Sequence, residues 1–245
     1  MTLHQDETPA LSPITNSTRR QVAVMSLRRA LLSGELLPGQ RVKETAMAEL
    51  LGISRPTVRE AMNQLISEGS LVQEPYKGVR VAQPSRQDLL DVAEVRVSLE
   101  TLAALRVARD PGGPAMPALR RALGRHLDAL GADDAVAASR THLDLHRTLW
   151  EVSGNLMLQK IWPLVESQIL MAMSLDQAAR HAPARDAELH ERLIEVIGSG
   201  DEAAIVAEVR EHIASSADEV LQLIGSPGAD DTSAMKAEPA EGPLQ

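Results

Sequence analysis

The sequence contains no cysteine and no phenylalanine, and Tyr76, Trp150 and Trp162 are its only tyrosine and tryptophan residues. Without cysteine, neither disulfides nor thiolate metal sites can form, and a reducing compartment is acceptable. Aromatic residues make up 1% of the chain and hydrophobic residues 44%. The core must therefore be built from Ala, Leu, Val, Ile and Met, which favours packed helices over sheets.

Long apolar segments are also missing. A membrane-spanning helix needs about 18 or more consecutive apolar residues, and the sequence has no such run. The first residues do not show a basic segment followed by an apolar one, as a secretory signal would. We therefore expect a soluble cytoplasmic protein that makes no contact with membranes.

Charge is unevenly distributed along the chain. The net charge of -9 argues against a nucleic-acid-binding protein if it is taken as a whole. Residues 15–85, however, contain ten Lys and Arg against six Asp and Glu, so the acidic excess lies in the remainder. This asymmetry predicts one module that binds a polyanion and a second module that binds something else.

The stretch from Glu49 to Leu65 predicts a helix-turn-helix. Gly52 suits the left-handed residue that ends a helix, and Ser54 is a good N-cap for the next one. Pro56 is tolerated because it falls in the first turn. The apolar residues behind the cap recur at helical spacing and predict one buried face: Val58, Ala61, Met62 and Leu65.

The exposed start of this helix carries Arg55, Thr57 and Arg59. Two guanidiniums and a hydroxyl at a helix N-terminus suit an anion. The alternative is a solvated helix face, which we disfavour because Glu60 is the only acid close to the two arginines in the sequence.

The expected fold is mainly α, with an N-terminal winged helix-turn-helix followed by an all-α helical bundle. Residues 15–83 predict helices at 18–33, 44–51 and 55–68, and then a β-hairpin of strands 71–74 and 78–81 with Lys77 and Gly78 at its tip. Residues 84–225 form the second domain. Its expected helices, with Ser85 as a possible N-cap of the first, are 86–109, 116–130, 133–152, 155–181, 185–197 and 201–224. Residues 1–14 and 226–245 lack periodicity, and we expect them to be disordered.

Four histidines are directed towards the core of the predicted bundle. His142 and His146 are spaced i, i+4 and share one helical face, while His190 and His212 lie on the apolar stripes of two further helices. Each one can be a core residue with a single hydrogen bond. Together, four neutral imidazoles at about 2.0–2.1 Å can bind zinc, and nickel or copper also suits nitrogen ligands. His126 and His181 lie near helix ends, so we expect them at the surface.

These patterns resemble a known family. The segment Arg41–Val81 resembles the DNA-binding domain of GntR-family bacterial transcription regulators, most clearly in residues 48–61 and 65–69. The remainder resembles the helical FCD domain of the FadR subfamily. There the resemblance is carried by residues 96–100 and 142–155 and by His190 and His212 beside Gly200-Asp201.

For the helical domain, the resemblance implies a metal held by one Asp and three His, and carboxylate effectors. In this chain His142 occupies the position of the usual Asp, which gives a set of four histidines, His142, His146, His190 and His212. Such a site is more positive than the usual one and favours anionic ligands. For Arg96, two readings are open: an i, i+4 ion pair with Glu100, or a contact with an effector carboxylate.

For the DNA-binding domain, the resemblance implies that Arg55 and Arg59 read guanine edges. Ser54 and Thr57 would contact phosphate, and Lys77 with Gly78 would form the wing contact. Thr45 stands where many relatives place an arginine, so that contact is weakened.

The sequence therefore predicts a ligand-responsive transcription regulator and not an enzyme. We expect a homodimeric repressor on a near-palindromic operator, with a carboxylate or sugar acid bound near a divalent metal, with zinc expected and nickel as the alternative. One alternative is the same regulator without metal, which binds its ligand directly. Another is a metalloenzyme that uses the histidine cluster, but the sequence shows no acid or base placed beside the cluster, and the winged helix would then be unexplained.

Overall fold

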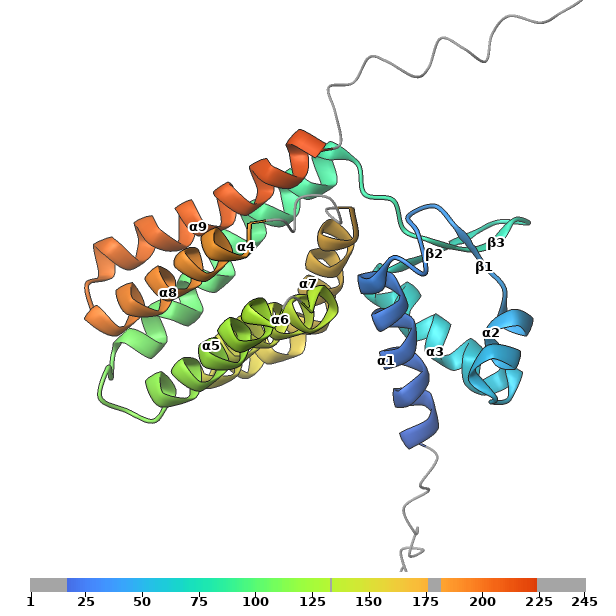
Figure 1. The fold of residues 1–245 in the computed structure, drawn as a ribbon, viewed down its shortest axis with the longest axis horizontal. Coiled ribbons are helices and arrows are strands. Elements are labelled where there is room, and N and C mark those ends of the chain that lie inside the picture. The colour runs from blue at the N-terminus through green and yellow to red at the C-terminus, as the bar shows by residue number, and fades with distance from the viewer. Residues whose placement is uncertain (1–16, 133, 176–181, 224–245) are drawn as a thin grey trace, which may run out of the picture.

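The computed structural model describes residues 17–132, 134–175 and 182–223, which form two units side by side (Figure 1). The predictions of disorder for residues 1–14 and 226–245 lie outside the described residues. The same holds for the surface position expected for His181.

The N-terminal unit consists of three helices and a small sheet. Its elements are α1 (Ser17–Ser33), β1 (Arg41–Val42), α2 (Glu44–Leu51), α3 (Arg55–Glu68), β2 (Leu71–Glu74) and β3 (Gly78–Val81). The strands are antiparallel in the order β1-β3-β2, with Leu71 opposite Val81 and Val42 opposite Val79. The predicted winged helix-turn-helix is confirmed. Sequence analysis missed β1 because two residues are too short to show an alternating pattern.

The apolar face predicted for α3 forms the core of this unit. Its four residues are buried against α1 and the sheet, together with Leu31 and Leu71. The buried members from α3 are Val58, Ala61, Met62 and Leu65. The side chains of Arg55 and Arg59 near the N-terminus of α3 lie outside this buried face and are exposed.

A very short connection leads from the sheet to the second unit. The backbone N–H of Ala82 donates to the carbonyl of Ser70 at 3.0 Å, so the chain is still held to the sheet there. Ser85 then caps the next helix: its Oγ accepts from the N–H of Asp88 at 3.2 Å, and its own N–H donates to Asp88 Oδ2 at 2.8 Å. This capping box confirms the predicted N-cap and fixes the direction in which the helix begins.

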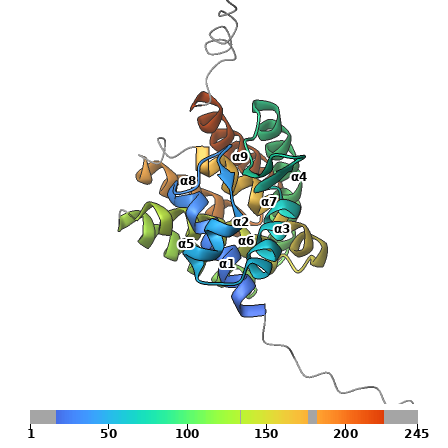
Figure 2. The same ribbon diagram turned by 90° about the vertical axis from the view of Figure 1, so that its right-hand side faces the viewer.

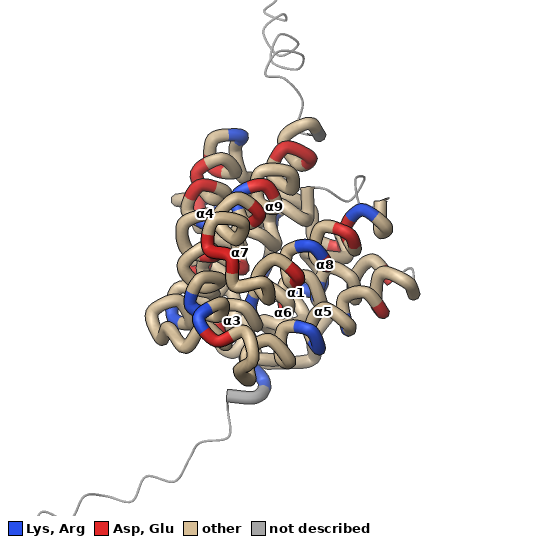
Figure 3. Tube along the Cα trace, turned by 90° about the vertical axis from the view of Figure 1, so that its left-hand side faces the viewer, with Lys and Arg blue, Asp and Glu red and all other residues tan. Residues whose placement is uncertain are grey.

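The second unit is a helical bundle. It consists of α4 (Arg86–Ala108), α5 (Ala115–Gly131), α6 (Ala135–Val152), α7 (Leu156–Leu175), α8 (Pro183–Ser199) and α9 (Glu202–Leu223). In Figure 1, α4, α8 and α9 lie over α5, α6 and α7, and Figure 2 shows the same bundle behind the N-terminal unit. Predicted helix ends differ from these by one or two residues, apart from residues 176–181, which lie outside the described residues. Figure 3 shows acidic residues along α4 and α9, as the charge asymmetry predicts.

Trp150 and Trp162 lie in the bundle core. Their rings meet edge to face with centroids 5.2 Å apart, and both are almost fully buried. None of the helices in the described ranges is long and apolar enough to span a membrane.

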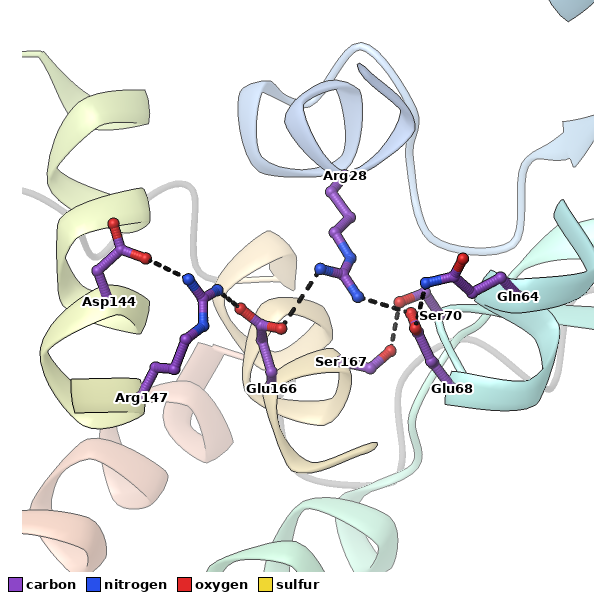
Figure 4. Close-up of polar contacts among 8 residues, drawn as sticks. All are labelled: Arg28, Gln64, Glu68, Ser70, Asp144, Arg147, Glu166 and Ser167. Atoms are coloured by element: carbon purple, nitrogen blue, oxygen red, sulfur yellow. Dashed lines mark hydrogen bonds and ion pairs between the residues drawn. The ribbon is translucent and has the colours of Figure 1, made fainter. Parts of the chain in front are cut away.

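Polar contacts join the two units (Figure 4). Glu166 of α7 accepts bonds from Arg147 of α6 and from Arg28 of α1, the second over 3.3 Å. Arg28 also donates to Glu68 Oε2 at 2.7 Å, at the C-terminal end of α3. A hydroxyl pair of Ser70 and Ser167 lies next to this chain of ion pairs. The contacts therefore connect a helix of the bundle to the helix that begins behind Ser54.

Candidate functional site

The turn between α2 and α3 fixes the exposed start of α3. Gly52 closes α2 with a φ of 62°, and Ser54 caps α3 by accepting from the N–H of Thr57 at 3.4 Å. The two hydroxyl oxygens lie 2.8 Å apart. Arg55 is the first residue of the helix and is exposed. Free backbone N–H groups and the helix dipole at this end favour a bound anion.

Arg59 forms a salt bridge that sequence analysis missed. Its guanidinium donates to both carboxylate oxygens of Glu44, over distances of 2.8–3.1 Å. The expectation that Glu60 is the only nearby acid is therefore wrong, because Glu44 comes from the start of the neighbouring helix. The hydrogen bond and the charge of Glu44 raise the pKa of Arg59. Because the Arg59 side chain is 60% exposed, water screens this pair strongly, and a nucleic acid can compete for the arginine.

The hairpin tip and the start of α2 flank this surface. Lys77 is exposed beside Gly78, whose φ of 92° favours glycine. A Cβ at Gly78 would lie 3.4 Å from a guanidinium nitrogen of Arg41, so a third arginine lies beside the wing. Sequence analysis did not assign Arg41. Thr45 is exposed at the start of α2, next to Glu44.

In the bundle, three of the predicted metal ligands come together from three helices. His146 of α6, His190 of α8 and His212 of α9 have their ligand nitrogens within 4.8 Å of one another. The three are 1–2% exposed. The Nε2 atoms of His146 and His212 face each other at 3.4 Å. We call these three residues the histidine triad.

Hydrogen bonds orient two members of the triad. His146 Nδ1 lies 2.8 Å from Glu100 Oε2, and His190 Nδ1 lies 2.8 Å from the carbonyl oxygen of Asp186. Since carbonyl and carboxylate oxygens accept, each Nδ1 carries the proton and each Nε2 keeps its lone pair. Within the described residues, His190 Nε2 is buried without a hydrogen-bond partner. An acceptor that fixes the ring behind a free nitrogen is typical of metal-binding histidines.

A second group of ligand atoms shares His190 with the triad. His126, His142, Asp186 and His190 also lie within 4.8 Å of one another. The structure thus places His142 with His126 and Asp186, while its ring centroid is 4.8 Å from that of His146. His126 is 0% exposed and packs on the inner face of α5, so the expected surface position is wrong.

The electrostatics of the cluster favour neutral imidazoles. Burial lowers the pKa of His142 and of His212 well below 6.5, and repulsion from neighbouring histidines adds to this effect. Burial alone raises the pKa of Glu100, but the positive charge of Arg96 and the hydrogen bonds from Arg96 and His146 outweigh burial and hold it well below its usual range. The rings of His142 and His212 are therefore in the neutral form that binds a metal, and Glu100 beside the cluster stays ionised.

A cavity of about 390 Å³ opens beside this cluster. Arg96, His142 and Asp186 contribute to its wall, whereas the three members of the triad do not line it. Arg96 donates from Nε to Glu100 Oε1 at 2.8 Å, so the ion pair expected as one reading is present. The remaining donors of the guanidinium are not used by that bond, so the second reading, contact with a carboxylate, also stays open.

Comparison with known proteins decides the family. The model "Bacterial regulatory proteins, gntR family" matches residues 19–81, and the model "FCD domain" matches residues 91–215. The chain belongs to the GntR family. It is therefore a transcription regulator and not an enzyme. Regulators of this family bind operator DNA through the helix-turn-helix and effector ligands in the FCD domain.

Curated relatives and solved structures agree with this. The GntR regulator is 25% identical to the gluconate operon transcriptional repressor of Bacillus subtilis over 202 residues, 80% of this chain and 83% of the relative. It is 28% identical to the Nta operon transcriptional regulator of Aminobacter aminovorans, over 76% of this chain and 87% of the relative. A GntR regulator from Rhodococcus sp. RHA1 and E. coli McbR/YncC share its fold, each with a TM-score of 0.73 over 84% of this chain and 99% of the other. The sequence identities are 19% and 18%.

The residues that sequence analysis missed in this GntR regulator had partial signals. His126 lies in step with the apolar residues Leu119 and Ala122 along α5, which marks the buried face. Asp186 precedes His190 by four residues, the spacing that places both on one helical face. Glu100 and Asp186 are carboxylates beside the cluster, so the expectation that no acid or base lies there is wrong.

Proposed function

We propose that this regulator is a homodimeric repressor that binds a near-palindromic operator in the cytoplasm. Its effector is a small carboxylate or sugar acid, bound in the helical domain next to a divalent metal, which we take to be zinc because zinc suits imidazole ligands. The observation that supports this proposal is the histidine triad, whose ligand nitrogens lie within 4.8 Å of one another, while Glu100 and the backbone of Asp186 hold the Nδ1 atoms of His146 and His190.

The DNA-binding part of the proposal assigns roles to exposed side chains. Arg55 and Arg59 enter the major groove and read guanine edges, because a guanidinium bonds O6 and N7 together. Ser54, Thr57 and the wing residues Lys77 and Gly78 contact the phosphate backbone. Thr45 is too short to replace an arginine at its position, and Arg41 beside the wing offers an extra phosphate contact.

The effector part rests on the cavity beside the cluster. Its volume of about 390 Å³ suits a molecule of the size of a sugar acid, and Arg96 supplies guanidinium donors at its wall. The name of the Bacillus subtilis relative refers to gluconate, which is a sugar acid. These observations support a carboxylate effector.

Dimerisation is supported by apolar side chains that remain exposed on the bundle. Leu90, Val95 and Leu102 of α4 are 39–50% exposed, and Val206 of the adjacent α9 is 39% exposed. A second copy packed against these helices would bury them and place two α3 helices in successive half-sites.

One screen tests the metal and the effector together. A thermal-shift assay of sugar acids and dicarboxylates is run on zinc-loaded and on chelator-treated protein, since a ligand that binds only the native state raises its apparent stability. We expect a stabilising acid whose shift disappears with chelator. A shift that persists in chelator would support the metal-free alternative, in which Arg96 binds the ligand directly. The same acid must then change operator binding in a gel-shift experiment.

A further inference from the structure

We infer that Tyr76, in the turn of the β2–β3 hairpin, is a specificity-determining residue that reads the minor groove of the operator. This role depends on the proposed placement of α3 in the major groove, and it extends base recognition from one groove to two. It is carried by a side chain to which neither the base readout nor the phosphate contacts proposed above assign a part.

Tyr76 has a backbone conformation that suits glycine. Residues 74–77 form a turn closed by a hydrogen bond from the N–H of Lys77 to the carbonyl of Glu74 at 3.2 Å. Pro75 takes the second position of this turn and Tyr76, with a φ of 63°, takes the third, which is the pattern of a type II turn. That third position normally carries glycine or asparagine, because a Cβ is strained at positive φ. Among the described residues, Tyr76 alone combines a side chain with a positive φ. A backbone outlier of this kind indicates a function for its side chain.

The ring of Tyr76 gains nothing from the fold in return for this strain. The side chain is fully exposed, and within the described ranges no hydrogen bond or ring contact holds it. The two tryptophans, by contrast, are buried in the bundle. A tyrosine has an apolar body and a hydroxyl at its end, which suits a surface that is apolar on its walls and polar at its floor. The position of the ring is therefore explained by what it meets outside the protein.

Positive charge surrounds the turn. Lys77 is exposed, and the guanidinium of Arg41 packs so close to Gly78 that a Cβ there would lie 3.4 Å from one of its nitrogens. The acid of the turn, Glu74, is paired with Arg80, whose Nε lies 3.0 Å from its Oε2. No ion pair among the described residues engages Lys77 or Arg41, so both remain available to phosphates. Cations at this tip favour the strongly negative, narrow minor groove of A·T-rich DNA.

The geometry of the unit brings the turn to the groove next to α3. The hairpin projects to the side of the N-terminal unit that lies away from the bundle, as the N-terminal end of α3 does (Figure 1). A phosphate backbone borders the major groove, and the minor groove lies beyond it. With α3 in the major groove and Lys77 at that backbone, the neighbouring Tyr76 reaches the minor groove.

The hydroxyl of Tyr76 selects the base pair there. Adenine N3 and thymine O2 are acceptors on the floor of the minor groove, and a phenolic O–H can donate to either. A G·C pair places the amino group of guanine in the way, and that group is a donor. We therefore expect a requirement for A·T pairs that flank the bases read by α3.

Variants of Tyr76 test this role. The operator is first selected from a random duplex pool with the full-length, unmodified protein, and affinities are measured by fluorescence anisotropy. Tyr76→Gly should bind about fivefold or more weakly, while its thermal unfolding midpoint is equal or higher because glycine relieves the backbone. Tyr76→Phe, which keeps the ring and lacks the hydroxyl, should lose part of the affinity. Val72→Thr, an exposed position on the same hairpin, is the control and should bind as the unmodified protein does.

Substituted base pairs identify the groove. An inosine·cytosine pair presents the minor-groove atoms of A·T and the major-groove atoms of G·C, so it separates readout in the two grooves. The unmodified protein should bind flanking A·T and inosine·cytosine pairs alike and G·C about tenfold more weakly. In Tyr76→Gly this preference should disappear. An equal loss of affinity in Tyr76→Gly on all three flanks would place the ring at the phosphate backbone and overturn minor-groove reading.

Arg59→Ala separates this role from the proposed function. If Arg59→Ala weakens operator binding and Tyr76→Gly does not, the readout by α3 stands and the role of Tyr76 is overturned. If Tyr76→Gly abolishes the flanking preference while Arg59→Ala has no effect, minor-groove reading stands and the proposed base contact of Arg59 is wrong.

Discussion

Arg28 of α1 and Glu166 of α7 form an ion pair across the junction of the two domains, with 3.3 Å between Nη1 and Oε2. Glu166 is also bound to Arg147 of α6, the helix that carries His142 and His146. On the other side, Arg28 reaches Glu68 at the end of α3. Four side chains therefore link α6 to α3, the helix that meets DNA. A change in α6 that accompanies ligand binding can reach α3 through these contacts.

Arg28→Ala should weaken the coupling between the two domains. It leaves the buried carboxylate of Glu68 without its guanidinium, so we expect a loss of roughly 1–3 kcal/mol in the free energy of unfolding. Operator affinity is measured by fluorescence anisotropy with zinc-loaded and with chelator-treated protein. The ratio of the two affinities should move towards one, since the ratio measures the coupling free energy. Arg29→Ala, exposed on the same helix, should leave both quantities unchanged; an equal effect of the two variants would contradict a specific role of Arg28.

Arg59→Ala should weaken binding to the specific operator by about ten- to a hundredfold and relax the preference at one base pair. Glu44→Gln should strengthen binding to non-specific DNA, because it releases Arg59 and removes a negative charge from the surface. Binding to operator and to random duplex is compared over a series of salt concentrations. Glu49→Gln, on the same helix, changes the charge equally without freeing Arg59. Identical results for Glu44→Gln and Glu49→Gln would show that the Arg59 pair is irrelevant to DNA binding.

Glu100→Gln should reduce zinc affinity by roughly 10–100-fold, because the carboxylate that orients His146 and increases its basicity is lost. Competition with a chromophoric chelator measures this affinity. Glu94→Gln, exposed on α4, is the control for the change in charge. Unchanged zinc affinity in Glu100→Gln would exclude His146 as a ligand.

The stability of the metal-free protein should fall as the pH drops below about 6.5. Burial lowers the pKa of His142, His146 and His212 below 6.5, so the unfolded chain binds protons there that the folded chain does not. Their contribution to stability is complete above pH 6.5 and is lost progressively below it. The low pKa values of Glu100 and Asp186 act in the same direction at more acidic pH. Urea unfolding at pH 7.5, 6.5 and 5.5 in chelator measures the trend, and His212→Gln should make it shallower. A stability that does not change over this range would mean that the rings bind protons as readily in the folded protein as in the unfolded chain.

Local signals in the sequence predicted the parts of the fold that local physics determines. The cap at Ser54, the left-handed Gly52 and the apolar stripe of α3 depend on neighbours within one or two turns, and all three are present. Arg59 shows the limit of this reasoning, because its partner Glu44 is fifteen residues away and comes close only through the helix-turn-helix geometry. The surface prediction for His126 failed for the same kind of reason: position near a helix end does not decide burial when another helix covers that end.

The histidine cluster was predictable in part. Spacing along α6 placed His142 and His146 on one face, and the structure brings both to the cluster. Spacing within one helix cannot show which atoms of different helices converge, so the division into two groups that share His190 required the packed bundle.

The short connection between the sheet and α4 couples movements of α4 to movements of the hairpin formed by β2 and β3. Only Gln83 and Pro84 separate Ala82, which is bonded to Ser70, from the capped Ser85. A connection of two residues, one with its φ fixed by the proline ring, allows very little independent movement of the sheet and α4. A tilt of α4 would therefore move the hairpin with it. Because Lys77 lies at the tip of the hairpin, far from the connection, it would be displaced further than α4 itself.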